Sequence, residues 1–446
     1  METPRLEEVR LTSFKSFTEQ RLPLQDLTVL IGRNGSGKSN ALDALTVLSR
    51  LVLGEPVRDA LDGPRTGGEE PIRGGAEGCP PLGSDSFSIG CRVRVGDAVY
   101  DFDLDIDVRP EVRISAERLV AVEGVRYGGR RLGAGRELLT VTPVDGEPGS
   151  RLLRYFNGRR ELEVAGVIWA DRLALHGVQA WVPGTTNAGH LVKEAAERVL
   201  SAIREIFLLD PVPHLMRRYV SERDVELRRS ADNLSAVLAE LRGKDRRAFS
   251  RIKELVAGMP EYPVTDLDVV RTSLGDVQLV LYEAGFHGDV HEMPARLLSD
   301  GMLRFLAFGT ALVDVPAPSC AADLLKPARL LVVEEIENGL YPTQAARVLT
   351  LMREEAQQRR VEVLFTTHSP ALLNSLSAQD HSGVIVCSRD PRSGESVLTR
   401  LTELPGYVDL LAAGDLGDAV TKNRLPDAVR PREPGVTSVE DFLRSL

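Results

Sequence analysis

Residues 32 to 39 read G-R-N-G-S-G-K-S, a spacing of glycine, lysine and serine that suits the binding of phosphate groups. Glycines let successive backbone N–H groups turn inward, and such groups at the start of a helix bind an anion. Lys38 would add a charge near the β- and γ-phosphates of ATP, and the Ser39 hydroxyl would hold Mg²⁺. The nucleotide-binding residues predicted from this motif are Asn34, Gly35, Ser36, Gly37, Lys38, Ser39 and Asn40. The alternative is a glycine turn before an ordinary helix.

Two apolar segments further along the chain end in side chains that could act on bound phosphates. Residues 329–333 precede Glu334, a predicted Mg²⁺ ligand, and Glu335, predicted to orient or deprotonate the attacking water. Residues 361–367 precede His368, which would hydrogen-bond the γ-phosphate and sense its loss. Paired acids also suit any exposed turn, and a lone histidine is more often structural. The prediction therefore depends on three strand ends meeting at one edge of a sheet.

A fourth candidate is the sequence L-S-D-G-M at residues 298–302. Ser299 is expected to cap a helix, and its hydroxyl, together with the free N–H groups around Gly301, offers another anion site. A plain helix cap is the alternative reading.

These side chains need strands and helices to position them, and the pattern predicts a mixed α/β fold. Residues 27–31 form an apolar, β-branched run, and the residues after Lys38 have helical spacing. We expect the first strand, from residue 9, to pair with residues 27–31, and the Gly- and Pro-rich residues 54–85 to form a surface loop. Period-two patterns from residue 87 to about 164 predict antiparallel strands.

Composition limits the class of protein. A chain of 446 residues with 43% hydrophobic residues can bury a large core, and its net charge of −10 excludes a uniformly basic coat for nucleic acid. The four scattered cysteines fit a reducing cytoplasm rather than a disulfide framework. The charged first residues do not suggest a signal peptide, and no apolar run approaches the ~20 residues of a membrane helix.

Basic residues are locally in excess between residues 217 and 253, within a predicted helical insert spanning 200–264. The cluster includes Arg246, Arg247 and Arg251, and it could contact DNA phosphates. A solvated helix face laced with salt bridges is the commoner outcome for such a pattern.

Taken in order, G-R-N-G-S-G-K-S, L-S-D-G-M, L-L-V-V-E-E-I-E-N-G-L-Y-P and T-T-H-S-P resemble the Walker A, signature, Walker B with D-loop, and H-loop motifs of an ABC-type ATPase head. The similarity is to the SMC/RecF/OLD-like AAA family ATPases, strongest over residues 9–50 and 290–376. It implies a P-loop head in two halves, residues 1–199 with Walker A and a β subdomain and residues 265–446 with the other motifs, separated by the helical insert.

The resemblance also implies a homodimer that closes around two ATP molecules. Ser299 and Gly301 of one chain would then meet the nucleotide held by Lys38 of the other, and Glu337 and Asn338 would cross the same interface. The expected function is an ATP-dependent switch on DNA or a partner effector, in bacterial DNA repair or anti-phage defence. The alternatives are an ATP-binding scaffold with little turnover that holds a separate nuclease or toxin and, less favoured, a transporter subunit. The spacing leaves no room for a long coiled coil, and the last residues lack the acidic pattern of a TOPRIM nuclease domain.

Overall fold

A computed structural model describes residues 3–64, 70–147, 149–257, 264–285, 289–314, 329–338, 345–412, 414–422 and 424. Within them, fourteen strands form one continuous mixed sheet. In their order across the sheet they are β11 (Leu162–Trp169), β10 (Ser150–Phe156), β9 (Arg136–Pro143), β6 (Arg113–Glu123), β5 (Ala98–Asp107), β4 (Ser86–Val95), β1 (Pro4–Phe14), β2 (Phe17–Pro23), β20 (Ser396–Arg400), β19 (Val384–Arg389), β3 (Leu27–Ile31), β18 (Val361–Thr366), β17 (Arg329–Val333) and β12 (Ile206–Leu209). The prediction of a mixed α/β head is confirmed.

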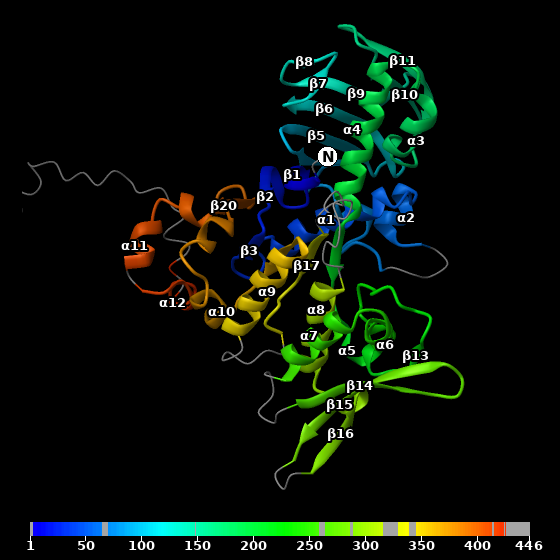
Figure 1. The fold of residues 1–446 in the computed structure, drawn as a ribbon. Coiled ribbons are helices and arrows are strands. Elements are labelled where there is room, and N and C mark those ends of the chain that lie inside the picture. Colours follow the sequence, from blue (N-terminus) through cyan, green and yellow to red (C-terminus); the bar gives the residue numbers. More distant parts are fainter. Residues whose placement is uncertain are drawn as a thin grey trace, which may run out of the picture.

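Two smaller sheets lie near opposite ends of the view in Figure 1. One contains β13 (Val220–Ser221), β14 (Val264–Arg271), β15 (Asp276–Ala284) and β16 (Val290–Pro294), with β14 to β16 at the bottom of the view, and the other contains β7 (Arg126–Tyr127) and β8 (Arg130–Arg131) at the top. The helices are α1 (Lys38–Val52), α2 (Val57–Asp62), α3 (Ala174–Trp181), α4 (Asn187–Arg204), α5 (Pro213–Met216), α6 (Leu234–Lys244), α7 (Arg246–Ala257), α8 (Asp300–Val313), α9 (Ala345–Arg359), α10 (Pro370–Asn374), α11 (Tyr407–Ala412) and α12 (Leu416–Thr421). None of the helices in this described part is long and apolar enough to cross a bilayer.

The five strands β12, β17, β18, β3 and β19 run parallel to one another, and the motif residues follow the ends of β3, β17 and β18. Because side chains alternate across a strand, the two faces of this parallel block contribute side chains to two separate hydrophobic cores. Leu330 and Leu364 join the core around α1 and α4, whereas Leu331 and Phe365 join the core around α6, α7 and α8. Burial on both faces explains why these strands are mostly apolar and do not alternate apolar and polar residues.

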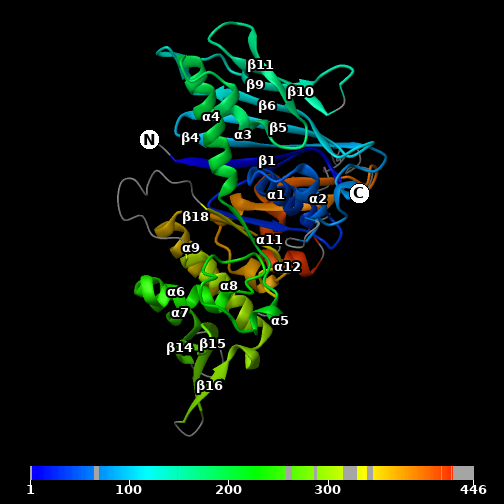
Figure 2. The same cartoon turned by 90° about the vertical axis from the view of Figure 1, so that its right-hand side faces the viewer.

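The antiparallel strands do not form a detached subdomain sheet, because β1 and β2 join them to the parallel block (Figures 1 and 2). The predicted pairing of the first strand with residues 27–31 is wrong. β1 pairs with β2 and β4, while β3 lies between β18 and β19, where both of its edges are already occupied. Helix α4 packs along the antiparallel strands, and it runs across residues 199 and 200, where the sequence placed a domain boundary. The division into domains stays a prediction.

Residues 54–85 are not simply a surface loop. Val57, Ala60 and Leu61 lie at helical spacing and are buried on one side of α2, and Ile72 is buried beside them. A short 3₁₀ helix, η1 (Ala76–Gly78), follows. This packing fixes the course of the backbone around Arg73, a residue that the sequence did not single out.

Candidate functional site

The glycine-rich loop lies between β3 and α1, at the carboxyl end of the parallel strands. Gly37 has φ +114°, and a Cβ there would lie 2.3 Å from the Ser396 hydroxyl oxygen. Gly32 has φ +154°, and a Cβ there would lie 2.2 Å from the carbonyl oxygen of Cys387. Only glycine therefore fits these two positions, and the loop lies directly against β19 and β20.

The contacts from β19 and β20 fix the shape of the loop. The Ser36 carbonyl accepts hydrogen bonds from the Ser396 hydroxyl at 2.6 Å and the Cys387 thiol at 3.2 Å. Arg389 donates from Nε to the Gly35 carbonyl at 2.9 Å. The Ser36 N–H donates to the Arg33 carbonyl within the loop at 3.1 Å. With the carbonyls of Gly35 and Ser36 held on one side, other N–H groups of the loop can face an anion on the opposite side. Burial raises the pKa of Cys387 to about 11, so this thiol stays protonated and able to donate.

Lys38 is largely buried, and its ammonium group forms hydrogen bonds with the glycine-rich loop itself. Nζ donates to the carbonyls of Gly32 at 2.8 Å and Arg33 at 3.1 Å. Burial lowers the pKa of Lys38, and the negative charges of Glu335 and Glu334 act in the opposite sense. The amine lies within electrostatic range of both candidate carboxylates.

The two residues predicted as Mg²⁺ ligands meet. The Ser39 hydroxyl donates to Glu334 Oε1 at 2.5 Å. A hydroxyl and a carboxylate side by side supply the hard oxygen ligands that Mg²⁺ prefers, so this pair fits the ion. The guanidinium of Arg73 also lies here, with Nη1 at 3.2 and 3.1 Å from the two oxygens of Glu334.

Glu335 has an unusual backbone conformation, with φ +49°. Its N–H donates to the Thr366 hydroxyl at the end of β18, at 2.8 Å, and its Oε2 accepts from the Asn338 amide at 2.8 Å. A left-handed conformation in a non-glycine residue is strained, and it persists only where neighbours enforce it. The carboxylate of Glu335 is therefore held in two ways, through the backbone hydrogen bond to Thr366 and through the hydrogen bond from Asn338 to Oε2.

His368 follows β18 and lies on the same edge of the sheet. Its backbone N–H donates to the carboxylate of Glu337. Burial, and next the charge of Lys38, lower the pKa of His368, while Glu337 and Glu335 act in the opposite sense. The imidazole is thus predominantly neutral near pH 7, with one nitrogen able to donate and the other able to accept. Among the described residues, the side chain of Glu337 accepts from His368 and the side chain of Asn338 donates to Glu335.

The helix cap predicted at Ser299 is confirmed, since its hydroxyl accepts from the Met302 N–H at 3.2 Å. The adjacent Asp300 forms an ion pair with Arg217 at 2.5 Å. Among the contacts of the described residues, none joins Ser299 or Gly301 to the glycine-rich loop of the same chain. The structure thus brings together Walker A, Glu334, Glu335 and His368, and leaves the signature helix α8 apart.

Two residues of the predicted set have other surroundings. Asn34 lies exposed at the tip of the loop. The Asn40 amide donates to the Ser16 hydroxyl at 2.8 Å, and that hydroxyl is 2.7 Å from the Ser396 hydroxyl. Through Ser16, Asn40 is therefore linked to Ser396, one of the residues that hold the glycine-rich loop in place.

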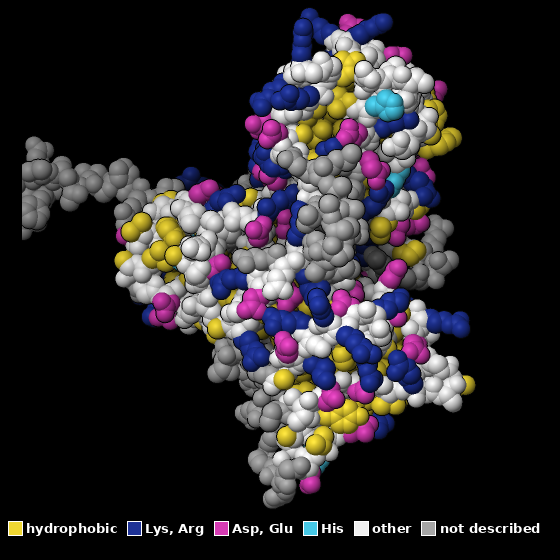
Figure 3. All heavy atoms as spheres, in the orientation of Figure 1, with side chains coloured by type: hydrophobic (Ala, Val, Ile, Leu, Met, Phe, Trp, Pro, Cys, Tyr) yellow, Lys and Arg dark blue, Asp and Glu magenta, His cyan; other side chains and the backbone are white. Residues whose placement is uncertain are grey.

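The basic helical insert is mostly neutralised by its own neighbours. Arg251 forms ion pairs with three acids, the buried Glu355 at 2.7 Å among them. Arg251 therefore agrees with the alternative of a salt-bridged helix face, because α7 packs this arginine toward the acids of α9. Its contact with DNA stays a prediction. In Figure 3, basic and acidic side chains are interspersed over the region around α5 to α8. Arg246 and Arg247 are exposed, and among the described residues no ion pair engages them.

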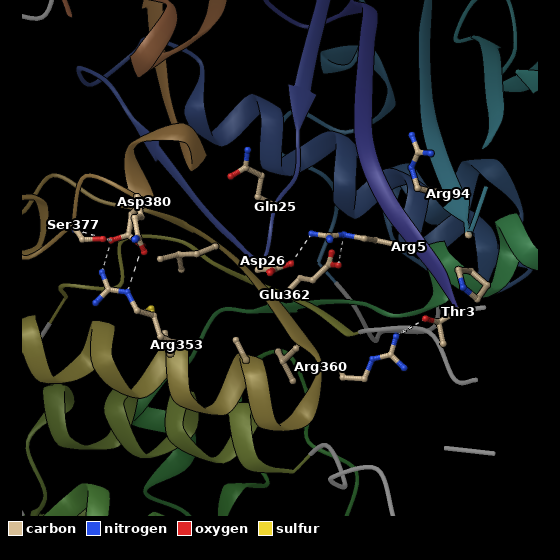
Figure 4. Close-up of a pocket in the computed structure, with 17 residues that line it drawn as sticks. Thr3, Arg5, Gln25, Asp26, Arg94, Arg353, Arg360, Glu362, Ser377 and Asp380 are labelled. Carbon is tan, nitrogen blue, oxygen red and sulfur yellow. Dashed lines mark hydrogen bonds and ion pairs between the residues drawn. The ribbon is translucent and has the colours of Figure 1, made fainter. Parts of the chain in front are cut away.

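A hollow of about 910 Å³ lies at the opposite end of the parallel strands, where β3 and β18 begin (Figure 4). Its arginines already have partners. Arg5 lies between Asp26 at 2.8 Å and the buried Glu362 at 2.7 Å, and Arg353 pairs with Asp380. Burial raises the pKa of Glu362 to about 7 and outweighs the charge of Arg5. This hollow is remote from the motif residues.

Comparison with known proteins agrees with the geometry of the site. The family described as "AAA domain, putative AbiEii toxin, Type IV TA system" matches residues 27–374. The chain belongs to this family. It is a P-loop ATPase, as the motifs predicted. No curated protein matches the sequence.

Several solved structures resemble the chain at low identity. An SMC head bound to the C-winged helix domain of ScpA is 15% identical, with a TM-score of 0.47 over 89% of this chain and 97% of that one. The SMC head domain from Thermotoga maritima is 13% identical, with a TM-score of 0.40 over 89% and 98%. The recombination mediator protein RecF, with ATP, is 11% identical, with a TM-score of 0.38 over 90% and 100%.

The sequence did not predict three parts of the site. Cys387, Arg389 and Ser396 support the loop from strands that carry no motif. Thr366 was quoted only as part of the H-loop sequence. Arg73 lay in a segment read as a loop, although the helical spacing of apolar residues at 57, 60 and 61 could have revealed its packed course.

Proposed function

We propose that this ATPase binds ATP and Mg²⁺ at the Walker A loop and acts as a switch that opens and closes with the nucleotide. The observation that carries the proposal is the meeting of Lys38, Ser39, Glu334, Glu335 and His368 at one edge of the sheet. In this proposal the loop N–H groups and Lys38 hold the phosphates, and Ser39 and Glu334 hold the metal. A bound Mg²⁺ would offset the charge of the phosphate oxygens.

The remaining residues have roles that suit phosphoryl transfer to water. Glu335 would orient the attacking water and accept its proton, because its carboxylate is fixed by Asn338 and by the backbone bond to Thr366. A neutral His368 would donate one hydrogen bond to the γ-phosphate and so report its loss. The strained backbone of Glu335 supports this assignment, because such strain is typical of catalytic positions.

The position of Ser299 supports a dimer. Within the described part of a single chain, no contact joins the capped N-terminus of α8 to the loop, so a second copy would have to supply Ser299 and Gly301 to the bound nucleotide. An isologous pair of heads provides two such composite sites by symmetry. ATP then acts as part of the interface, and hydrolysis separates the heads.

Mixing two inactive variants tests the composite site. Lys38→Ala keeps an intact Ser299, and Ser299→Arg keeps an intact Lys38. Each alone should lack ATPase activity, whereas an equimolar mixture should regain about a quarter of the wild-type rate, since random pairing makes half of the dimers mixed and each mixed dimer has one intact site. A mixture as inactive as its components contradicts the dimer.

We further propose that the switch acts in the cytoplasm of a bacterium, on a partner effector or on DNA, in DNA repair or anti-phage defence. The free, buried thiols of Cys79, Cys91 and Cys387 suit a reducing compartment. For DNA, the exposed Arg246 and Arg247 are the candidate contacts. Their joint replacement by glutamate should weaken DNA binding and reduce the slope of log affinity against log salt concentration. If that slope is unchanged, Arg246 and Arg247 do not contact DNA phosphates.

A scaffold with little turnover is the second candidate, and the bonds of Lys38 favour it. Its amine is engaged by two loop carbonyls, so phosphate binding must first break these bonds. Such a scaffold would hold a separately encoded nuclease or toxin. Comparing Glu335→Gln with the wild type decides between the two, because equal ATPase rates favour the scaffold and a large loss favours the enzyme-driven switch.

A further inference from the structure

The Arg73 guanidinium donates four hydrogen bonds in the site, to three residues. Nη1 reaches both carboxylate oxygens of Glu334, and Nη2 donates to the Ser39 carbonyl at 3.1 Å. On its other side Nε donates to Asp43 Oδ1 at 3.0 Å. One side chain therefore bridges the candidate metal ligand to helix α1.

The two ends of this bridge differ in burial. The Asp43 side chain is 5% exposed and also binds Lys15 Nζ at 2.6 Å. Lys15 in turn donates to the Arg73 carbonyl at 2.7 Å, so the backbone and the inner edge of Arg73 are anchored. Glu334 is 31% exposed and Arg73 is 49% exposed, so their contact is open to water. The hydrogen bonds from Arg73 to Glu334 are therefore the contacts in this bridge that another cation could replace.

The Arg73 guanidinium and a divalent cation cannot both bind the two carboxylate oxygens of Glu334 at the same time. Both oxygens of Glu334 accept from Arg73, and Oε1 also accepts from Ser39. A divalent cation bound by Ser39 and Glu334 would need these lone pairs and would repel the guanidinium at that distance. Occupation by Arg73 and by the metal are therefore alternatives.

We propose that Arg73 is a built-in competitor of Mg²⁺, which neutralises Glu334 in the resting head and is displaced when the metal enters with the nucleotide. This inference rests on the proposed function, since it assigns the metal to Ser39 and Glu334. Its consequence is that Arg73 raises the Mg²⁺ concentration at which nucleotide binding becomes tight. Asp43 and Lys15 retain the segment, so displacement moves the guanidinium and leaves the backbone in place.

The test measures the affinity of a fluorescent, non-hydrolysable ATP analogue over a series of Mg²⁺ concentrations, with Mn²⁺ binding followed by electron paramagnetic resonance as a second readout. Arg73→Gln should lower, by about fivefold, the Mg²⁺ concentration at which the affinity for the ATP analogue rises half-way to its maximum. A change of about fivefold is what the loss of a half-exposed ion pair produces. Arg73→Lys keeps one charge without the planar fork and should give a smaller shift in the same direction. Arg58→Gln is the matched control, because Arg58 is exposed on the neighbouring α2 and should shift nothing.

The outcomes separate the two proposals. A lower Mg²⁺ requirement and tighter Mn²⁺ binding in Arg73→Gln, with Arg58→Gln unchanged, support the inference. An unchanged requirement in a variant with wild-type thermal stability overturns it, and a raised requirement overturns it by making Arg73 a nucleotide ligand. If Arg73→Gln unfolds, the same criteria apply to Arg73→Lys. A wild-type protein that binds no nucleotide at any Mg²⁺ concentration contradicts the proposed function itself.

Discussion

Replacement of Thr366 by valine tests how the site holds its proposed catalytic carboxylate. Thr366 is 1% exposed at the end of β18, and its hydroxyl is the acceptor for the Glu335 N–H at 2.8 Å. Valine has nearly the same shape but cannot accept a hydrogen bond. The substitution therefore removes one contact while changing little of the packing.

The expected cost follows from that single bond. Leaving a buried N–H without its partner costs about 1–3 kcal/mol. Because Glu335 at φ +49° is itself strained, its backbone would relax and shift the carboxylate. A displacement of ~1 Å at a catalytic group can lower a rate by about 100-fold. We therefore expect ATP turnover to fall by about 10- to 100-fold, with nucleotide affinity unchanged because Lys38 and Ser39 keep their contacts.

The measurements are steady-state ATPase rates, affinity for a fluorescent ATP analogue and thermal unfolding. Thr310→Val is a matched control, because the buried Thr310 hydroxyl has no hydrogen-bond partner among the described residues. That variant should be as stable as the wild type or more stable, and equally active. If Thr366→Val loses stability yet keeps its turnover within about twofold of wild type, the bond does not position the carboxylate, and the reasoning is refuted.

Three further predictions follow from the packing. Gly37→Ala should abolish nucleotide binding in a fluorescence titration without unfolding the head, because the new Cβ would lie 2.3 Å from the Ser396 hydroxyl oxygen; binding at wild-type affinity would contradict this. Glu117→Gln should lower the free energy of unfolding by about 3–5 kcal/mol in denaturant titrations, since it leaves the fully buried Arg151 without its charged partner; a loss below about 1 kcal/mol would be contrary to it. The pKa of Glu362 is about 7 in the folded protein against an ordinary 4.5, so between these values the folded state binds more protons than the unfolded one. Stability should therefore fall as pH rises from about 4.5 to 7, and thermal unfolding of Glu362→Gln should show a shallower fall; equal slopes would count against the raised pKa.

The sequence was most informative where local pattern and local chemistry coincide. Mostly apolar segments at 329–333 and 361–366 predicted strands, and the residues that follow these strands were expected to meet at one edge of a sheet. The glycine motif before a helix was equally direct. Together these features led to Lys38, Ser39, Glu334 and His368, residues far apart in the chain that the fold gathers.

The parts that sequence could not predict depend on tertiary neighbours. Ser396 supports the loop from a strand more than 350 residues later, and nothing in its local sequence marks that role. The pairing of the first strand failed because β18 and β19 take both edges of β3. The charge of Arg251 was visible in the sequence, but its acidic partners on α9 were not. A charge pattern shows which residues can pair and leaves open which ones do.

The molar mass of the Glu335→Gln protein, measured by light scattering during size-exclusion chromatography with Mg²⁺ and with or without ATP, tests the central claim most directly. That claim is that one head's triphosphate site is completed by the Ser299 helix of a second head. We expect a monomer of 48.8 kDa without ATP, a doubled mass with ATP, and a return to the monomer mass when Ser299→Arg is added to the same protein. A protein that binds ATP tightly but keeps its monomer mass, or a dimer that Ser299→Arg does not disturb, would contradict it.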